Sequence, residues 1–598
     1  MSSQVYRGPV RKLVVGIDIG TTFSGASYII LDPGEVPRIH DITCYPGQEN
    51  EAGHYRIPSI LYYRPDGTLH SVGAEAAKPE MDFVAEDEDL TFVEWFKLHL
   101  RPERLDSDAL SSRDLPPLPP NKTVVAVFAD FLGYLFAFIG RYIRERHGGG
   151  ESLWNSVKDH IEFILGHPNG WEGLQQSKMR QAAVVAGLIP DTSEGHSRVH
   201  FVTEGEASLN FCINNGLTND TMRDGKSVII IDAGGGTVDI SSYRFLSTSP
   251  ISVEEITSPA CILQGSTRVN VRLSGFLKRH LASSVFGNEE DIKIILKTFE
   301  KETKPMFEDE SAQSYVKFGK RKDNDPAVNI RRGQLTLSGS EMTSFFRPAV
   351  VSILRAIGRQ RDGASAALST AFLVGGFAAS PWLYSTLKKE LESSGVTLYR
   401  PDSHTSKAVA NGAISFYLDH LVSSRVMKMT YGAKTAIPYC IGNLEHISRY
   451  RQKIVRPSGR IVLPNAFAVI LQKGTRVREK EEMSRSFYQE APSSSKLNSI
   501  SSAVTVYPEA DAPNWVDVKP ELFTTLCTIS ADTSQVCRTP MEGANGVYYV
   551  QNFDIVLLCG LTEMQAQLRW VENGIERRGP AKIIYDDDLQ MPQKSTCS

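Results

Sequence analysis

The chain has 598 residues, too many for one compact core, which predicts roughly two to four domains. Apolar residues make up 41% of the chain and charged residues 22%, a composition that is typical of a soluble globular protein. The net charge is −4 and no basic cluster carries interleaved aromatic residues, so neither nucleic acid nor a membrane is expected as a partner.

The chain begins with a short tail, residues 1–11, ahead of its first apolar run. That run is short and is not followed by a small-residue cleavage site, which argues against a secretory signal peptide. The eight cysteines are scattered and form no CxxC pair. Both features favour a reducing compartment with free thiols, so the expected location is the cytoplasm.

An acidic residue interrupts the first strand-like run, in the stretch VVGIDIGTTFSG at 14–25. Aspartate is depleted in strands and a buried carboxylate needs compensation, so Asp18 requires a partner. The residues after it, Gly20, Thr21 and Thr22, predict a tight turn whose N–H groups and hydroxyls hold an anion. Asp18 would then face the cation that accompanies the anion. An ordinary hairpin remains the alternative for this stretch taken alone.

Strand-like and helix-like segments follow one another through the N-terminal part, which predicts an α/β fold. The expected strands are 13–19, 26–31, 161–165 and 227–232, and the expected helices are 125–146, 172–187 and 204–213. The apolar run FLGYLFAFIG at 131–140 spans half a membrane as a helix, so a core helix is expected there. Loops or insertions are expected at 112–122, 146–151 and 308–333.

The pattern of the first hairpin recurs at 228–241, in the stretch VIIIDAGGGTVDIS. After the apolar strand come an aspartate, three glycines, a threonine and a second aspartate, which are Asp232, Gly234, Gly235, Gly236, Thr237 and Asp239. Glycine lets a phosphate approach backbone N–H groups, and a hydrated Mg²⁺ needs only one or two carboxylates behind its water. Two such hairpins predict a duplicated fold in which they face each other across a cleft.

A third glycine turn follows a predicted helix at 341–358, for which Ser338 or Ser340 is the expected cap. The turn lies in FLVGGFAASPWL at 372–383, and a helix N-terminus after Gly375 and Gly376 would suit the α-phosphate and ribose of a nucleotide.

The character of the sequence changes at about residue 425. Strands are expected at 503–507, 522–529 and 546–560, a hairpin turn at Asn573-Gly574, and a linker or long loop at 491–499. These features predict a mainly β C-terminal module over 425–585, followed by a tail at 586–598.

Taken in this order, the segments resemble the actin-like ATPase superfamily, and within it the 70-kDa heat-shock protein family. GIDIGTTFSGAS and IDAGGGTVDIS resemble the two phosphate motifs of that family, while 163–209 and 407–413 resemble its two connecting segments. QGSTRVN at 264–270 and FLVGGFAASPWL resemble the divergent branch around heat-shock 70-kDa protein 12 and its fungal relatives. The resemblance covers roughly residues 12–424.

The resemblance implies a duplicated, two-lobed, ribonuclease H-like nucleotide-binding domain over 12–424. The first lobe would cover about 12–225 and the second about 226–424, with the chain returning to the first lobe near the connecting segments. It also implies ATP or ADP with Mg²⁺ as the ligands of the cleft.

The resemblance assigns roles to single residues. Asp18, Glu204 and Asp232 would hold magnesium through water, Lys97 would touch the γ-phosphate and Asp239 would lie near the attacking water. The residues implied in catalysis are Asp18, Lys97, Glu204, Asp232, Thr237 and Asp239. Those implied in nucleotide binding are Gly20, Thr21, Thr22, Gly234, Gly235, Gly236, Thr237, Gly265, Lys304, Gly375 and Gly376. Glu300 and Lys304 would correspond to a helix on the adenine side.

Two departures from the family pattern affect the expected function. Ala379 stands where ordinary members carry the arginine that stacks on adenine, which predicts a looser hold on the base. The usual apolar linker is not visible near 415–430, and the C-terminal region is short for a β-sandwich with a helical lid, which argues against ordinary peptide chaperoning.

The function expected from these observations is slow, Mg-dependent ATP hydrolysis coupled to lobe closure and to a protein client or partner of the C-terminal module. The alternative is a nucleotide-controlled scaffold with little hydrolysis. A small-molecule kinase on the same fold is less favoured, because no segment matches the sugar-kinase signatures, and a filament-forming actin relative is disfavoured too.

Overall fold

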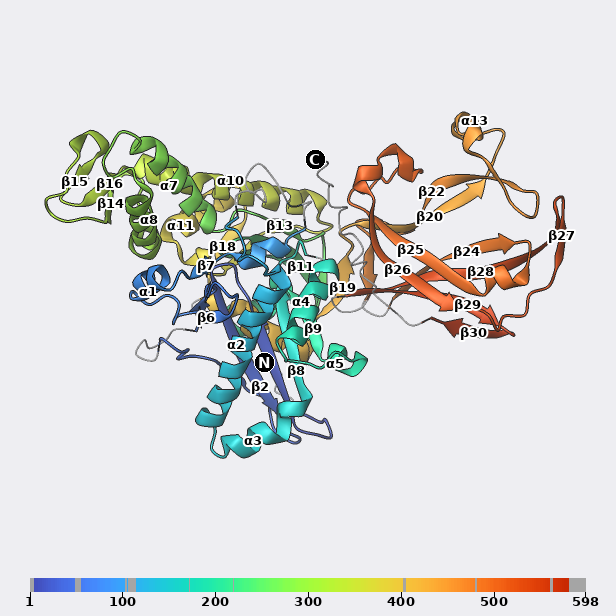
Figure 1. Ribbon diagram of the computed structural model, residues 1–598, viewed down its shortest axis with the longest axis horizontal. Coiled ribbons are helices and arrows are strands. Elements are labelled where there is room, and N and C mark those ends of the chain that lie inside the picture. The colour runs from blue at the N-terminus through green and yellow to red at the C-terminus, as the bar shows by residue number, and fades with distance from the viewer. Residues whose placement is uncertain are drawn as a thin grey trace. The chain divides into compact units, whose positions relative to one another are not determined.

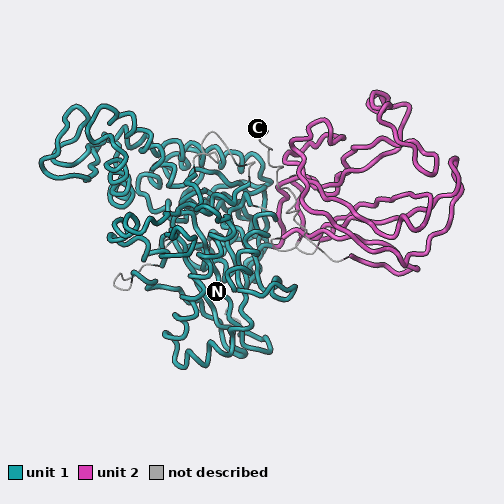
Figure 2. Tube along the Cα trace, in the orientation of Figure 1, with its two compact units in different colours: residues 1–422 teal, residues 423–598 magenta. Residues whose placement is uncertain are grey.

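The computed structural model describes residues 5–48, 55–102, 105, 115–171, 173–218, 220–401, 405–478, 481–559 and 563–579. The chain forms two compact units, residues 1–422 and residues 423–598 (Figure 2). Unit 1 combines helices with several sheets, whereas unit 2 consists mostly of strands (Figure 1). This architecture confirms the predicted mixed α/β class.

The first large sheet of unit 1 combines an antiparallel hairpin with parallel strands. Its strands, in spatial order, are β3 (Ile39–Asp41), β2 (Phe23–Leu31), β1 (Lys12–Asp18), β8 (Ile161–His167) and β9 (Val199–Thr203), and β4 (Ile57–Pro58) pairs with β2. β1 is antiparallel to β2 and parallel to β8, which is parallel to β9. Asp18 is therefore the last residue of a central, buried strand.

The second large sheet of unit 1 repeats this series of pairings. Within unit 1 its strands include β12 (Ile251–Glu255), β11 (Val238–Thr248), β10 (Ser227–Ala233), β17 (Thr370–Val374) and β18 (Thr397–Tyr399), and β13 (Ala260–Ile262) pairs with β11. β10 is antiparallel to β11 and parallel to β17, which is parallel to β18. β10 thus has the place in this sheet that β1 has in the first, and Asp232 lies near its end.

Helices cover these sheets (Figure 1). Their bounds are α1 Met81–Asp87, α2 Val124–Arg146, α3 Gly150–Val157, α4 Gly173–Val185, α5 Ser193–Ser197, α6 Glu204–Asn215, α7 Thr267–His280, α8 Glu289–Thr298, α9 Lys304–Met306, α10 Gly339–Gly363, α11 Pro381–Ser393 and α12 Ala408–Asp419. Among the described residues, α2 is the one helix long and apolar enough to cross a membrane. Its buried face, which includes Phe128, Phe131 and Leu135, belongs to the core around the first sheet.

Two helices cross at very short range behind the sheets. Gly412 of α12 lies against Ala207 of α6, and a Cβ atom on Gly412 would lie 1.8 Å from the Ala207 carbonyl oxygen. α12 also packs on β1, β2 and β8. The absence of a side chain at Gly412 therefore fixes how closely these two connecting helices approach.

Two stretches of unit 1 that were predicted as loops or insertions contain regular structure. The stretch 308–333 contains β14 (Ser314–Lys317) and β15 (Ile330–Arg331), which form a small sheet with β16 (Gln334–Leu337), because Val316 and Ile330 are buried between polar neighbours. The stretch 146–151 includes the start of α3 at Gly150. In the loop predicted at 112–122, residues 115–122 form no helix or strand, and 112–114 lie outside the described residues.

The N-terminal part holds one further small sheet. Its strands are β6 (Leu69–Val72), β5 (Leu61–Tyr63) and β7 (Thr91–Val93). A short 3-10 helix, η1 (Phe96–Leu100), follows β7 and carries Lys97.

Unit 2 contains two antiparallel sheets. The first consists of β21 (Ile454–Val455), β22 (Ile461–Leu471), β20 (Thr430–Pro438), β25 (Ser499–Tyr507) and β26 (Thr524–Asp532). The second consists of β24 (Glu482–Ala491), β28 (Gly546–Cys559), β29 (Met564–Glu572) and β30 (Ile575–Arg578), with β27 (Met541–Gly543) on β28. Ile500 and Ile529 of the first sheet share one apolar core with Ile555 and Leu568 of the second.

The remaining elements of unit 2 are short. β19 (Val422–Val426) pairs with β23 (Arg476–Arg478), and α13 (Leu444–Ser448) lies between β20 and β22. Asn573 and Gly574, both at positive φ, form the turn between β29 and β30. The predicted linker at 491–499 is the connection between β24 and β25, and the predicted tail at 586–598 lies outside the described residues.

Candidate functional site

The turns that follow β1 and β10 are in contact. A Cβ atom on Gly235 would lie 2.3 Å from the Thr22 hydroxyl oxygen, and one on Gly236 would lie 2.4 Å from the Thr21 hydroxyl oxygen. Only glycine permits such an approach. The two hairpins predicted from the sequence therefore meet in the fold, although Asp18 and Asp232 are 214 positions apart in the chain.

Two further glycines border the second turn. The backbone N–H groups of Gly265, Ser266 and Thr267 donate hydrogen bonds to carbonyl groups of the turn over 2.9–3.1 Å. Gly375 has φ +91°, and a Cβ atom on it would lie 2.4 Å from Asp232 Oδ1. Both glycines thus leave room for the turn and its carboxylate, and any side chain at Gly375 would displace Asp232.

Four buried carboxylates lie behind the turns. They are Asp18 at the end of β1, Glu204 at the start of α6, Asp232 on β10 and Asp239 on β11. Asp232 and Asp239 are direct partners in the register of the second hairpin. Thr203 caps α6 by accepting a hydrogen bond from the N–H of Glu206, which fixes the helix start at Glu204.

Two cations neutralise two of the carboxylates. Lys97 Nζ donates to Glu204 Oε1 over 2.6 Å, and its side chain is buried beside Trp171. Arg56 Nη2 donates to Asp18 Oδ2 over 2.6 Å. Lys97 was predicted as a site residue, whereas Arg56, which directly precedes β4, carried no signal in the sequence.

The other two carboxylates have neutral donors, and neither donor was predicted. The Ser208 hydroxyl donates to Asp232 Oδ2 over 2.6 Å, and the Asn169 backbone N–H donates to Asp239 Oδ1 over 2.6 Å. Ser208 follows Glu204 by four residues on α6, so helical spacing alone would have placed both on one face. Nothing local marks Asn169.

The site holds more carboxyl groups than cations, and this raises the pKa values of the carboxyl groups. Burial, with Glu204 and Asp18 nearby, raises the pKa of Asp232 to about 7, although Ser208 opposes the shift. Burial and Glu204 raise the pKa of Asp239 well above its usual value. Burial also raises the pKa of Glu204, against the effect of Lys97. Four acids therefore share two cations, and the site favours the uptake of additional positive charge.

The chemistry of these residues suits a divalent cation with phosphate groups, although the cavity between them has room for only about one water molecule. The lining side chains and turns are Asp18, Gly20, Thr21, Thr22, Phe23, Arg56, Lys97, Glu204, Asp232, Gly234, Gly235, Gly236, Thr237, Gly376 and Val409, around a cavity of about 30 Å³. The surplus carboxylates suit a cation, and the glycine turns suit phosphate oxygens. Among the described residues, no group of three or more acidic, histidine or cysteine side chains is placed to hold a metal ion. Mg²⁺ keeps most of its water in proteins, so one or two carboxylates are enough for it.

Comparison with known proteins identifies three distant relatives. No family model matches the chain. Human heat shock 70 kDa protein 12B is 22% identical over 513 residues, which cover 70% of this chain and 71% of the relative. The 12A proteins of mouse and human are each 22% identical over 514 residues, covering 72% of this chain and 73% of each relative. The chain is a divergent relative of the heat shock 70 kDa protein 12 group.

In this relative of heat shock 70 kDa protein 12, the residues expected on the adenine side are not among those around the small cavity at the turns. Lys304 begins α9 and donates to Asn270 Oδ1 over 3.0 Å and to Glu300 Oε1 over 3.5 Å. Burial lowers the pKa of Lys304, against the effect of Glu300. Ala379 ends a short 3-10 helix, η7 (Phe377–Ala379), and is exposed. A role for Lys304 or Glu300 in nucleotide binding remains a prediction.

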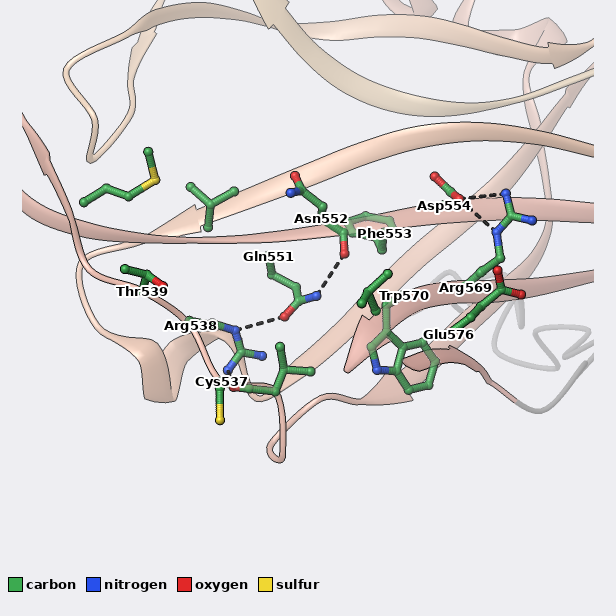
Figure 3. Close-up of a pocket in the computed structure, with 14 residues that line it drawn as sticks. Cys537, Arg538, Thr539, Gln551, Asn552, Phe553, Asp554, Arg569, Trp570 and Glu576 are labelled. Carbon is green, nitrogen blue, oxygen red and sulfur yellow. Dashed lines mark hydrogen bonds and ion pairs between the residues drawn. The ribbon is translucent and has the colours of Figure 1, made fainter. Parts of the chain in front are cut away.

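A second cavity, of about 640 Å³, lies in unit 2 of this relative (Figure 3). β28 and β29 are paired from Asp554 and Arg569 onward, but residues 549–553 of β28 pair only with β24. The Asp554–Arg569 ion pair, with 2.8 Å between Oδ2 and Nη2, lies beside the resulting notch (Figure 3). Arg538 Nε–H donates a hydrogen bond to Gln551 Oε1 over 2.9 Å. The notch offers a binding surface whose charged groups already have partners: Asp554 and Arg569 pair with each other, Arg538 bonds neutral groups, and Glu576 pairs with Arg578.

The Lys97–Glu204 pair provides a test of the electrostatic description. Lys97→Met should lower the free energy of unfolding by about 3–5 kcal/mol at about pH 8, because it leaves a buried carboxylate without its cation. Acidification should reduce this loss, since Glu204 has a raised pKa and then takes up a proton. Urea unfolding followed by tryptophan fluorescence would measure it.

The double variant Lys97→Met/Glu204→Gln is the matched control. It removes both charges and should recover most of the lost stability. A Lys97→Met protein that equals the wild type in stability at about pH 8 would contradict the buried ion pair.

Proposed function

We propose that this chain binds ATP or ADP with Mg²⁺ between the two lobes of an actin-like domain and hydrolyses ATP slowly. The observation that carries the proposal is the contact between two Asp-Gly-Thr hairpins above four buried carboxylates. The relationship to heat shock 70 kDa protein 12 supports it.

The proposal includes a duplicated domain with lobes at about 12–225 and 226–424. Its support is the shared order of antiparallel and parallel strands, in which β1 corresponds to β10, β2 to β11 and β8 to β17. The two aspartates at the strand ends, Asp18 and Asp232, then occupy equivalent positions. Where two copies of one unit face each other, the equivalent hairpins of the two copies form a site between them.

In this proposal the turns bind phosphate oxygens and the carboxylates hold the hydrated cation. Backbone N–H groups of Gly20, Gly235 and Gly236, with the hydroxyls of Thr21, Thr22 and Thr237, would contact the phosphates, whereas the Gly234 N–H closes the turn on the Thr237 carbonyl over 2.9 Å. Magnesium, when bound, would neutralise charge on the β- and γ-phosphate oxygens. Lys97 would add a fixed positive charge, and Asp239, with its raised pKa, is a stronger base for a proton from water than an exposed aspartate.

One contact favours the second candidate, a nucleotide-controlled scaffold with little hydrolysis. Arg56 already forms an ion pair with Asp18 at 2.6 Å, so it competes with magnesium for this carboxylate. A site that keeps this pair would bind nucleotide with weaker dependence on the metal and would stabilise the transition state less well.

Phosphate release from Mg-ATP under single-turnover conditions, together with thermal melting, separates the candidates. Release above the protein-free rate and a melting temperature raised by Mg-ATP support the ATPase. A raised melting temperature without phosphate release supports the scaffold. A protein that shows no phosphate release and no rise in melting temperature would contradict nucleotide binding. We also propose a protein partner for unit 2, so a reduced, carboxymethylated lactalbumin should change the release rate if that partner is an unfolded client.

A further inference from the structure

Exposed apolar side chains gather on one segment of unit 2, residues 440–456, which we call the α13 loop. Ile441 and Leu444 are 81% and 83% exposed, and the other exposed apolar residues of the loop are Ile447, Tyr450, Ile454 and Val455. α13 lies in the connection between β20 and β22 (Figure 1). Single exposed apolar residues are ordinary, but such a run along one loop marks an interaction surface.

The α13 loop is held in place by buried polar anchors. His446 Nδ1 accepts a hydrogen bond from the Cys440 N–H over 3.0 Å, and the His446 ring packs edge-on against Trp515. Arg449 stacks on the same indole at 4.4 Å and binds both carboxylate oxygens of Asp517 at 2.8 Å. With His446 turned inward, the structure leaves Leu444 and Ile447, three residues apart on α13, exposed to solvent.

The charges of the α13 loop are unlike those of the whole chain. The loop carries four basic residues and one acidic residue, Glu445, in a chain of net charge −4. Asp517 neutralises Arg449, whereas Arg451, Lys453 and Arg456 form no ion pair with an acid among the described residues. Lys453 donates a hydrogen bond to the Tyr450 hydroxyl over 2.7 Å, and Arg456 lies over the Tyr488 ring. Of the acids on neighbouring elements, Glu490 accepts the Ser458 N–H and Asp517 is already paired.

The α13 loop presents exposed apolar side chains next to basic side chains, a combination that is complementary to the surface of an anionic membrane. An anionic bilayer offers an apolar interior beneath negatively charged headgroups, so it satisfies both features of the loop together. A protein groove would have to supply an apolar floor and an acidic rim of matching shape. The charge complementarity therefore favours the membrane.

We propose that the α13 loop binds the surface of an anionic membrane. Ile441, Leu444 and Ile447 enter the boundary between headgroups and acyl chains, while Arg451 and Lys453 contact the anionic headgroups. This inference departs from the expectation of no membrane partner, which rested on the charge of the whole chain. It does not depend on the proposed nucleotide site in unit 1.

Vesicle flotation with the full chain tests the proposal. The protein should float with vesicles of phosphatidylcholine and phosphatidylserine, and only weakly with phosphatidylcholine alone. Leu444→Ser/Ile447→Ser should lower the affinity at least about tenfold, because both side chains lose apolar area for insertion. Arg451→Gln/Lys453→Gln should lower it by about 30-fold, at about a tenfold loss per 1.4 kcal/mol.

Val285→Ser in unit 1 is the matched control, since Val285 is 80% exposed and belongs to no such cluster. It should leave flotation unchanged, and all variants should melt at the wild-type temperature because the altered side chains are exposed. Wild-type protein that stays with the free fraction, or double variants that float like wild type, would overturn the proposal. Self-association that the Leu444→Ser/Ile447→Ser variant abolishes, without vesicle binding, would instead identify a protein surface.

Discussion

Replacing Asp232 by asparagine should lower Mg-dependent phosphate release by at least about 100-fold, because it removes a charged group from behind the second glycine turn. Asparagine keeps the shape and can still accept the hydrogen bond from Ser208. The affinity for Mg²⁺ should fall with it, while the protein should remain folded. Single-turnover release and thermal melts with and without Mg-ATP would measure both effects.

The same substitution should alter the pH dependence of stability. The pKa of Asp232 is raised from 3.8 to about 7 in the folded state, so the folded protein holds a proton between about pH 4 and pH 7 that the unfolded chain releases. The contribution of Asp232 to stability is thus fully present below about pH 4, falls as the pH rises toward 7, and is lost above it. Asparagine cannot ionise, and the variant should gain stability over the wild type above about pH 7.

Asp362→Asn is the control for both measurements, because Asp362 is exposed near the end of α10. It should change neither phosphate release nor the pH profile. An Asp232→Asn protein with wild-type release would contradict the assignment of the site, and one with a wild-type pH profile would contradict the raised pKa.

Gly412→Ala should destabilise unit 1 by about 3 kcal/mol or more, although alanine is the better helix former. The new Cβ atom would lie 1.8 Å from the Ala207 carbonyl oxygen, and that oxygen belongs to the backbone of α6, which cannot rotate away. The two helices must separate, and α6 carries Glu204 and Ser208. Urea unfolding should show the loss, and stabilisation by Mg-ATP should shrink with it.

Gly358→Ala on α10 is the matched control, because a Cβ atom there would meet nothing within 4 Å. It should be neutral or raise stability by up to about 1 kcal/mol. Equal effects of the two substitutions would show that helix propensity alone decides the result and that the close crossing does not hold in solution.

Where a signal was local, the sequence predicted it well. The strand expected at 13–19 is β1, and the one expected at 227–232 is β10, because in each an apolar run ends at an aspartate and a glycine turn. Ser338 caps α10 in a capping box with Glu341, one of the two caps expected. The Asn573-Gly574 turn follows from the positive φ that both residues accept.

Features that depend on tertiary packing could not be predicted from the sequence. Arg56 and Asn169 reach the site from loops, and no local pattern distinguishes them from surface residues. The carboxylates could be named in advance, but their cations could not, since an ion pair is decided by distance in space. Leu444 and Ile447 have the spacing of a buried helical face, and only the inward position of His446 shows that they are exposed.

The place of α12 in the fold has a consequence for how the chain is made. α12 packs on β1, β2 and β8 and against α6, yet it is the last helix of unit 1 to leave the ribosome. About 200 residues separate β9 from the end of α12, which takes roughly 10–40 s at ordinary rates of synthesis. Throughout that interval α12 is not yet available to pack on the first sheet. The apolar residues of β1, β2 and β8 that it covers therefore stay accessible to chaperones and to other nascent chains. The folding of unit 1 is thereby tied to the completion of its own translation.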